Sequence, residues 1–270
     1  MGANVKALKS RIRSVDSTLH LTRAMGLVAS SKMRRAGEAM TRSREYANAF
    51  SEAMALLAAS PECARSPYMA EPSGERVRLI VIAGDRGMAG GYIAKVFRLA
   101  KEYPDAEFLP IGKRACDRFG QGYESAEHFS RMDAAQLAKE LCAQFCAGEF
   151  DRLGILSTKY VSMMSQEAQV QWILPLQRPE GARPAGVLFE PDERTVLEAV
   201  VPNYVAGRLV QAVRESFACE VAARRTAMDS AGKNAQVMID DLQLQYNRAR
   251  QNAITQEITC LLYTSPSPRD

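Results

Sequence analysis

Residues 77–92, VRLIVIAGDRGMAGGY, decide the fold class of this 270-residue chain. An unbroken apolar run at 79–83 is followed by a glycine-rich turn, and apolar residues then recur three and four apart from Ile93 to Ala100. An unbroken apolar run is typical of a strand buried on both faces, and the later spacing is typical of one face of a helix. The stretch therefore predicts the strand, loop and helix of an α/β unit.

The alternation of strand and helix continues toward the C-terminus. Residues 106–119, AEFLPIGKRACDRF, repeat the change from strand to helix, and residues 133–148 have a helical spacing. Two further strands are predicted in RLGILSTKYVSM, 152–163, and AQVQWILPL, 168–176. These elements together predict a compact, Rossmann-like α/β domain over residues 76–190.

The residues before this domain have the period of a long helix. Apolar residues three and four apart form a narrow coiled-coil seam, which comprises Val5, Leu8, Ile12, Val15 and Leu19 and continues with Met25, Val28, Met33, Ala36 and Met40. We therefore predict an N-terminal coiled-coil helix over residues 1–59. Three prolines and a glycine then predict a linker over residues 60–75.

A second long helix is predicted at the other end of the chain, over residues 191–259. Its helical period is clear after Pro202, and its seam steps through Met228, Ala231, Ala235, Met238 and Leu242. From Leu209 to Thr259 such a helix would span about 75 Å, so it must lie against something equally long. The N-terminal helix is the candidate within the chain, and their simplest pairing is antiparallel because the α/β domain joins the end of one to the start of the other.

Charge and cysteine spacing narrow the function classes. Ten Lys or Arg residues lie from Lys6 to Arg44, against Asp16, Glu38 and the adjoining Glu45, and a helix this basic suggests an acidic partner.

The six cysteines have no C-x-x-C spacing, which argues against zinc and disulfide frameworks, and we expect no cofactor. Cys142 and Cys146 are instead predicted to be small buried hydrophobes on one helical face. The chain has no long apolar run and no signal segment, so we expect a soluble, cytosolic protein.

Four segments in order along the chain resemble the gamma subunit of bacterial F-type ATP synthase. They are LKSRIRSVDSTLHLTRAMGLVASSKMRRA at 8–36, GDRGMAGGY at 84–92, STKYVSMMSQEAQVQWILPL at 157–176 and NAQVMIDDLQLQYNRARQNAITQEIT at 234–259. In that family the two terminal helices form the central rotor shaft inside a ring of alpha and beta subunits, and the α/β domain meets the epsilon subunit and the c-subunit ring. The resemblance implies a non-catalytic subunit that couples ion translocation to ATP synthesis or hydrolysis. It also implies a peripheral location on the cytoplasmic face of the bacterial plasma membrane.

The resemblance also implies a set of coupling residues. Met25 lies in the stretch TRAM, which in the family faces an acidic catch loop of the beta subunit, with Arg23 and Lys32 as neighbours. Residues Arg250, Gln251, Thr255 and Glu257 occupy the matching positions on the other helix. A plain seam role for Met25 and a surface ion pair for Arg250 and Glu257 are the structural alternatives.

The glycine turn and the basic helix leave two other functions open. GDRGMAGG follows a strand, as a phosphate-binding loop does, but it matches neither G-x-G-x-x-G nor the P-loop. We interpret it as a tight structural turn that presents Asp85 and Arg86 at a subunit contact. The alternatives are a nucleotide-dependent α/β enzyme, which lacks an apparent catalytic constellation, and a basic coiled coil that binds nucleic acid, which lacks aromatic residues from Lys6 to Arg44.

The last residues depart from the family pattern. After ITQEIT the family continues as helix, whereas residues 260–270 read CLLYTSPSPRD and contain two prolines. Because proline lacks an amide donor and restricts the residue before it, we expect the helix to fray near Thr259 and the tail to be extended and disordered. We interpret this tail as foreign to the family.

Overall fold

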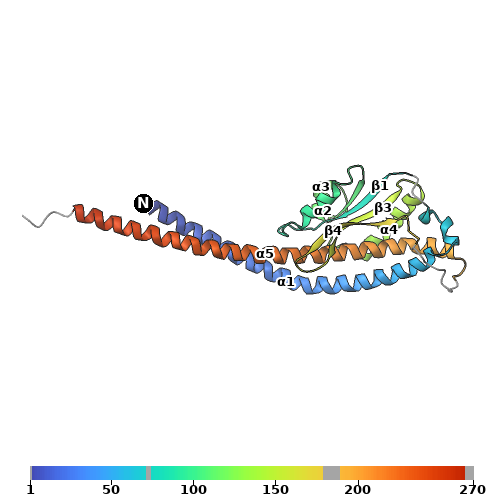
Figure 1. Cartoon of the computed structure of the whole chain (residues 1–270), viewed down its shortest axis with the longest axis horizontal. Coiled ribbons are helices and arrows are strands. Elements are labelled where there is room, and N and C mark those ends of the chain that lie inside the picture. Colours follow the sequence, from blue (N-terminus) through green and yellow to red (C-terminus); the bar gives the residue numbers. More distant parts are fainter. Residues whose placement is uncertain (1, 71–73, 179–188, 265–270) are drawn as a thin grey trace, which may run out of the picture. The chain divides into compact units, whose positions relative to one another are not determined.

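The computed structural model describes residues 2–70, 74–178 and 189–264, which fall into two compact units. One unit contains the residues up to Val28 together with those from Arg225 onward, and the other contains Ala29–Arg224. The elements in chain order (Figure 1) are α1 (Gly2–Ala58), the 3₁₀ helices η1 (Glu62–Arg65) and η2 (Pro67–Met69), β1 (Val77–Ile82), α2 (Tyr92–Ala100), β2 (Glu107–Ile111), α3 (Lys113–Phe119), α4 (Arg131–Cys146), β3 (Arg152–Tyr160), β4 (Gln166–Leu174) and α5 (Glu193–Thr264).

The unit Ala29–Arg224 is built on a four-stranded sheet in the order β2-β1-β3-β4. Strand β1 is central and parallel to both neighbours, with Ile80 opposite Leu109 of β2 and Ile155 of β3. Strand β4 is antiparallel to β3 because a short turn joins the two strands. The predicted mixed α/β class is confirmed, and each predicted strand is present.

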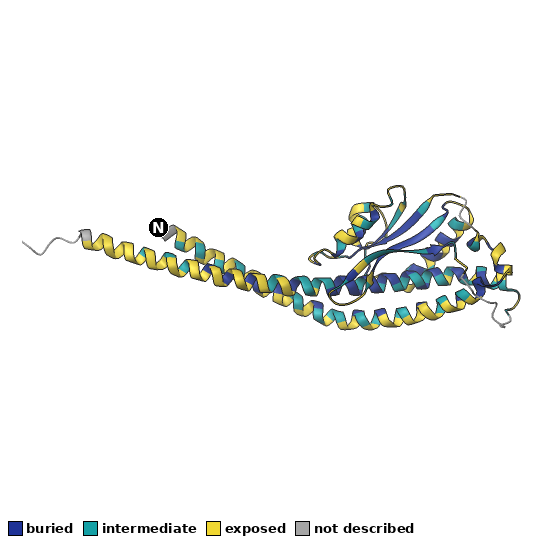
Figure 2. Cartoon of the chain, in the orientation of Figure 1, coloured by how far each residue is buried: buried dark blue, intermediate teal, exposed yellow. Residues whose placement is uncertain are grey.

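The sheet separates two apolar cores. Ile80 and Ile82 of β1 pack with α4, the end of α1 and the start of α5, while Val81 and Ala83 pack with α2 and α3 on the opposite face. Successive side chains of a strand point to opposite faces, so an unbroken apolar run serves both cores. Figure 2 shows most of the length of the central strands as buried.

The segment predicted as a linker, residues 60–75, is more ordered than a connection between domains. Its described part forms η1 and η2, and Cys63 and Tyr68 are buried in the larger core. The Tyr68 ring stacks on Phe145 of α4 at 6.0 Å between centroids. The prolines stop the long helix as predicted, but the apolar residues between them pack on the domain.

The unit formed by both chain ends is an antiparallel pair of helices. Residues near the start of α1 meet residues far along α5 in reversed order: Leu19 clusters with Ala235 and Ile239, and a Cβ on Gly26 would lie 3.7 Å from Met228 Cβ. The two segments run side by side in opposite directions in Figure 1. The predicted long terminal helices and their antiparallel pairing are therefore present in this unit.

Two predicted seam positions are wrong. Val28 and Met238 are 57% and 45% exposed, whereas the adjacent Ala29 and Ile239 are buried. Thr22 is also buried, although it was not predicted as a seam residue. The helical period of 3.6 residues drifts relative to a strict seven-residue repeat, and the buried stripe follows that drift.

The predicted end of α5 is also wrong. The helix continues past Thr259 to Thr264, because Cys260, Leu261 and Leu262 are compatible with a helix and Pro266 is the first residue that is not. At its other end α5 begins at Glu193 and contains Pro202, so helix formation starts well before the point where the period becomes clear. Residues 265–270 of the predicted disordered tail lie outside the described residues.

None of the helices in the described part of the chain has the length and apolar character needed to cross a bilayer.

Candidate functional site

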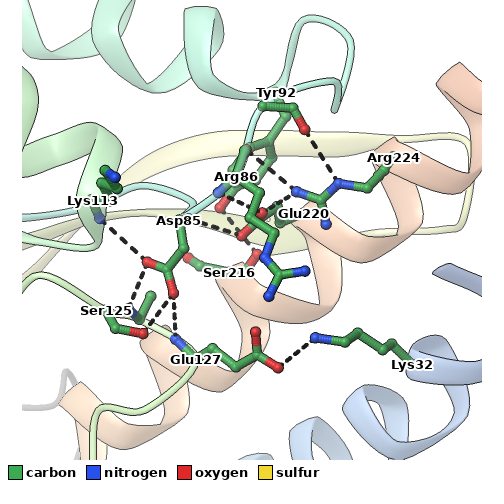
Figure 3. A network of polar contacts seen from close by, with 12 residues as sticks. Lys32, Asp85, Arg86, Tyr92, Lys113, Ser125, Glu127, Ser216, Glu220 and Arg224 are labelled. Atoms are coloured by element: carbon green, nitrogen blue, oxygen red, sulfur yellow. Dashed lines mark hydrogen bonds and ion pairs between the residues drawn. The ribbon is translucent and has the colours of Figure 1, made fainter. Parts of the chain in front are cut away.

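The glycine-rich loop that follows β1 is held against α5 by a buried acid, Glu220. The Glu220 side chain is 2% exposed, and its carboxylate accepts hydrogen bonds from the backbone amides of Asp85 and Arg86, both at 3.3 Å. A Cβ on Gly84 would lie 2.5 Å from the Glu220 carboxyl carbon. A larger residue at this position would force the Glu220 side chain to shift. Figure 3 shows the Glu220 side chain beside Asp85 and Arg86.

The charge of Glu220 is balanced by Arg224, one helical turn further along α5. The two side chains form an ion pair, and the Arg224 side chain is only 14% exposed. The same guanidinium donates to the carbonyl oxygens of Arg86 and Gly87, each at 3.3 Å. Glu220 thus accepts hydrogen bonds from the amides of the loop, and Arg224 donates hydrogen bonds to its carbonyl oxygens.

Asp85 lies on the other side of this loop and organises a second segment. Its carboxylate accepts hydrogen bonds from the amides of Ala126 at 2.8 Å, Glu127 at 3.0 Å and Lys113 at 3.3 Å, and from the Ser125 hydroxyl at 2.7 Å. Burial raises the pKa of Asp85, but these four donors favour the charged form and hold that pKa below its usual value. The Asp85 side chain is therefore engaged inside the chain.

The start of α2 is fixed to the same stretch of α5. Tyr92 is buried, and its hydroxyl donates to the carbonyl oxygen of Ser216 at 3.0 Å. Ser216 in turn accepts a hydrogen bond from the Thr158 amide of β3 at 3.2 Å through its hydroxyl oxygen. Helix α5 therefore crosses the carboxyl ends of β1 and β3 and bonds to both.

This geometry decides between the two interpretations of the glycine turn. A phosphate-binding loop leaves its backbone amides free for an anion at the carboxyl end of the sheet. Here the amides of Asp85 and Arg86 already bind the carboxylate of Glu220, which would repel an incoming phosphate. The turn is structural, because two of its amides bind α5.

Comparison with known proteins agrees with this fold. A family model described as ATP synthase matches residues 4–261. An ATP synthase gamma chain from Ruminococcus albus is 40% identical over 275 residues, covering 95% of this chain and 96% of the relative. The chain belongs to the ATP synthase gamma chain family.

Two further matches agree with this finding, one in sequence and one in fold. A sodium ion specific ATP synthase gamma chain from Acetobacterium woodii is 35% identical, with 96% of this chain and 97% of the relative covered. The rotor of the Euglena gracilis mitochondrial ATP synthase has the same fold, at a TM-score of 0.68 and 17% identity, over 94% of this chain and 100% of that chain. The enzyme and nucleic-acid alternatives are therefore wrong. The match of the family model ends at residue 261, just after the family pattern is lost in the sequence.

The coupling residues that the gamma family implies lie on the surface of the helical pair. Arg23 is exposed and its guanidinium lies 3.5 Å from the Gln236 side-chain oxygen of the opposite helix, while Met25 is half-buried. On α5 the side chains of Arg250, Gln251, Thr255 and Glu257 are all exposed.

Contacts within α5 leave these side chains available. The Thr255 hydroxyl donates to the Gln251 carbonyl oxygen of its own helix at 3.0 Å. Arg250 and Glu257 form no ion pair with each other or with any other residue that the structure describes, so the surface-pair alternative has no support here. Their role in coupling stays a prediction.

The remaining predicted residues lie in the unit Ala29–Arg224. The Lys32 ammonium lies 2.6 Å from the Glu127 carboxylate, so this cation is paired within the chain. Arg86 is exposed and is the residue of the glycine turn whose side chain is free to contact a partner, whereas Asp85 is engaged internally.

Sequence reasoning missed the residues that bind the loop to α5. Glu215 and Glu220 are both nearly buried, and the Glu215 carboxylate lies 2.7 Å from the Arg44 guanidinium. Their signal was present, because both acids lie among the apolar residues Val213, Ala218 and Val221, where a charged side chain needs a partner.

The predicted burial is confirmed for Cys142 and is wrong for Cys146. Cys142 is buried, and burial raises its pKa to about 12, whereas Cys146 is exposed. The described residues contain no cluster of three or more His, Cys, Asp or Glu side chains that could hold a metal ion.

Proposed function

We propose that this chain is the central shaft subunit of an ATP synthase. The helical pair turns inside the alpha and beta subunits, and the α/β domain contacts the epsilon subunit and the c-subunit ring. The chain itself catalyses no reaction, and its rotation couples ion translocation to ATP synthesis or hydrolysis at sites in the beta subunits. The other subunits hold it at the cytoplasmic face of the bacterial plasma membrane.

The observation that carries this proposal is the apolar surface of the helical pair. Large apolar side chains stand outside its buried seam on both helices: Leu21, Leu27 and Val28 on α1 and Val237, Leu244, Ile254 and Ile258 on α5 are 48–73% exposed. A soluble monomer rarely leaves so many large apolar side chains on one narrow element, and such a surface is typical of a protein interface. An enclosing ring of partner subunits would bury these side chains from all sides.

The surface charges suit a rotating contact. Exposed ion pairs contribute under about 1 kcal/mol each, so a charged helix can leave one set of acidic partners and meet the next without a deep energy minimum. Exposed cations such as Arg23 and Arg250 supply these weak contacts, and the side chains of Gln251, Thr255 and Glu257 supply further polar contacts along the same helix.

The α/β domain is Rossmann-like but does not bind a nucleotide. The parallel strands β2, β1 and β3 with helices on both faces and the glycine turn after β1 support a Rossmann-like origin. The carboxylate of Glu220 on the loop amides supports the loss of the nucleotide site. The domain organisation that we propose is 1–59, 60–75 and 76–190, followed by the C-terminal helix, which ends at Thr264 and not at residue 259.

Assembly tests this function directly. The full-length chain is co-expressed with bacterial alpha and beta subunits, and native mass spectrometry measures the complexes that form. We expect one copy of the chain in each assembly and ATP hydrolysis by that assembly. Alpha and beta subunits that assemble and hydrolyse ATP equally well without the chain bound would contradict the proposal.

The placement of Met25 is tested by Met25→Lys in the same complex. An added cation strengthens contact with an acidic loop, so we expect lower ion pumping for each ATP hydrolysed. Ala24→Lys is the matched control, because it adds the same charge at the next, exposed position. Equal pumping efficiency in the two variants would count against a special role for Met25.

A further inference from the structure

A small groove in the unit Ala29–Arg224 has the chemistry of an anion site. It lies between α1 and α5 at the start of α4 and has a volume of about 260 Å³. Its lining residues are Arg42, Ser43, Tyr46, Arg131, Asn203, Ala206, Gly207 and Val210. The lining thus contains two cations, three neutral polar side chains and no acid.

Both cations of this groove are uncompensated. Neither Arg42 nor Arg131 forms an ion pair with any residue that the structure describes, and both are exposed. Other arginines of the same unit are paired: Arg44 with Glu215 and Arg78 with Glu107. Two unpaired guanidiniums around one groove raise the local positive potential and favour an anion.

Neutral donors define the anion further. Tyr46 and Asn203 supply a hydroxyl and an amide. Arg131 is the first residue of α4, and because Ser130 and Asp133 already cap that helix, Arg131 contributes through its guanidinium alone. The Ser43 hydroxyl donates to the Met40 carbonyl oxygen at 2.9 Å, so its oxygen is left as an acceptor. Guanidinium groups bind phosphate oxygens in a bidentate geometry that suits a tetrahedral phosphate group.

We propose that this groove binds a phosphate group, either as free inorganic phosphate or as the headgroup of an anionic phospholipid. Arg42 and Arg131 hold the phosphate oxygens, and the Tyr46 hydroxyl and Asn203 amide donate to them. The lining residues Ala206 and Val210 are apolar and can contact the carbon atoms of an esterified phosphate. The site is separate from the glycine turn, where the carboxylate of Glu220 occupies the backbone amides.

Calorimetry on the full-length chain tests the site with inorganic phosphate as the probe. The double variant Arg42→Gln/Arg131→Gln should bind phosphate at least tenfold more weakly than the unmodified chain. The matched control is Arg35→Gln/Lys139→Gln, which removes the same charge from exposed positions of the same two helices outside the groove. The control should change binding less than twofold, because solvent and salt screen distant charges. Equal weakening by both pairs, or no binding by the unmodified chain in either arm, would overturn the proposal.

A second arm distinguishes the two sources of phosphate. Flotation with vesicles of phosphatidylcholine containing phosphatidylglycerol measures headgroup binding, and pure phosphatidylcholine vesicles are the reference. Retention on the anionic vesicles that Arg42→Gln/Arg131→Gln removes would assign the groove to a lipid headgroup, whereas binding of free phosphate alone would assign it to a soluble anion.

A variant at an exposed lining residue guards against misfolding as the cause of lost binding. Asn203 is exposed, so Asn203→Asp places a carboxylate in the groove without disturbing the core, and it should abolish phosphate binding while the melting temperature stays unchanged. Phosphate binding that survives in Asn203→Asp would also overturn the proposal.

Discussion

Replacing Glu220 by glutamine should destabilise the unit that contains the α/β domain. The substitution keeps the shape of the side chain but removes its charge, and it leaves the Arg224 side chain, 14% exposed, without its partner. Breaking a buried ion pair by removing one partner costs about 3–5 kcal/mol. Glutamine retains one acceptor for the loop amides, so we expect the lower end, about 3 kcal/mol. For a unit of this size that is a fall in melting temperature of roughly 6–12 °C.

Thermal unfolding of the full-length chain, followed by circular dichroism, measures this effect. Glu198→Gln is the matched control on the same helix, because the pair of Glu198 with Arg194 is 36% and 47% exposed. The control should cost under about 0.5 kcal/mol. Amide exchange at Asp85 and Arg86 should accelerate in Glu220→Gln and stay unchanged in the control.

A double variant separates the pair from its surroundings. Glu220→Gln/Arg224→Met removes both charges, so its cost should fall below the sum of the two single substitutions by about 2 kcal/mol. Additive costs, or a cost for Glu220→Gln no larger than that for Glu198→Gln, would refute the view that this buried acid holds the loop.

Two further predictions concern the Asp85 carboxylate and the two cysteines of α4. Because the pKa of Asp85 lies below its ordinary 3.8, the carboxylate stabilises the fold above that pH, and this contribution is lost as the pH falls through the folded-state pKa. The difference in unfolding free energy between the unmodified chain and Asp85→Asn should therefore shrink below about pH 4 in acid titrations, and a difference constant to pH 2 would contradict it. In the folded chain a maleimide should modify the exposed Cys146 within minutes. Cys142 should react only after unfolding, since it is buried and burial raises its pKa to about 12. Peptide mass mapping measures the labelling of each cysteine, and equal labelling of the two would show that α4 is not packed as described.

The sequence was sufficient for the elements and their class. A continuous apolar run predicted β1, because a central parallel strand is buried on both faces. The three-and-four spacing predicted both terminal helices and, with the α/β domain between them, their antiparallel pairing. The sequence did not predict every buried position of the seam, since Val28 and Met238 are apolar yet exposed, while Thr22 is polar yet buried.

The candidate site was predicted less completely, for a physical reason. Hydrophobic periodicity locates residues that share a face of one element, but it does not show which distant polar groups meet. Glu220 and the amides of the glycine turn lie 134 and 135 residues apart in the chain and come together only through the packing of α5 across the sheet. Asp85 was selected from the sequence, but its four internal donors come from residues 113 and 125–127, which no local pattern connects to it.

Direct observation of rotation tests the central claim of a turning shaft. A bead is attached through the exposed Cys146, after Cys260→Ser and Cys116→Ser remove the other accessible thiols, and the alpha and beta subunits of the complex are fixed to a surface. If the chain is a turning shaft, the bead rotates in one direction when ATP is supplied and stops when hydrolysis is inhibited. A complex that contains the chain and hydrolyses ATP while the bead remains stationary would contradict it.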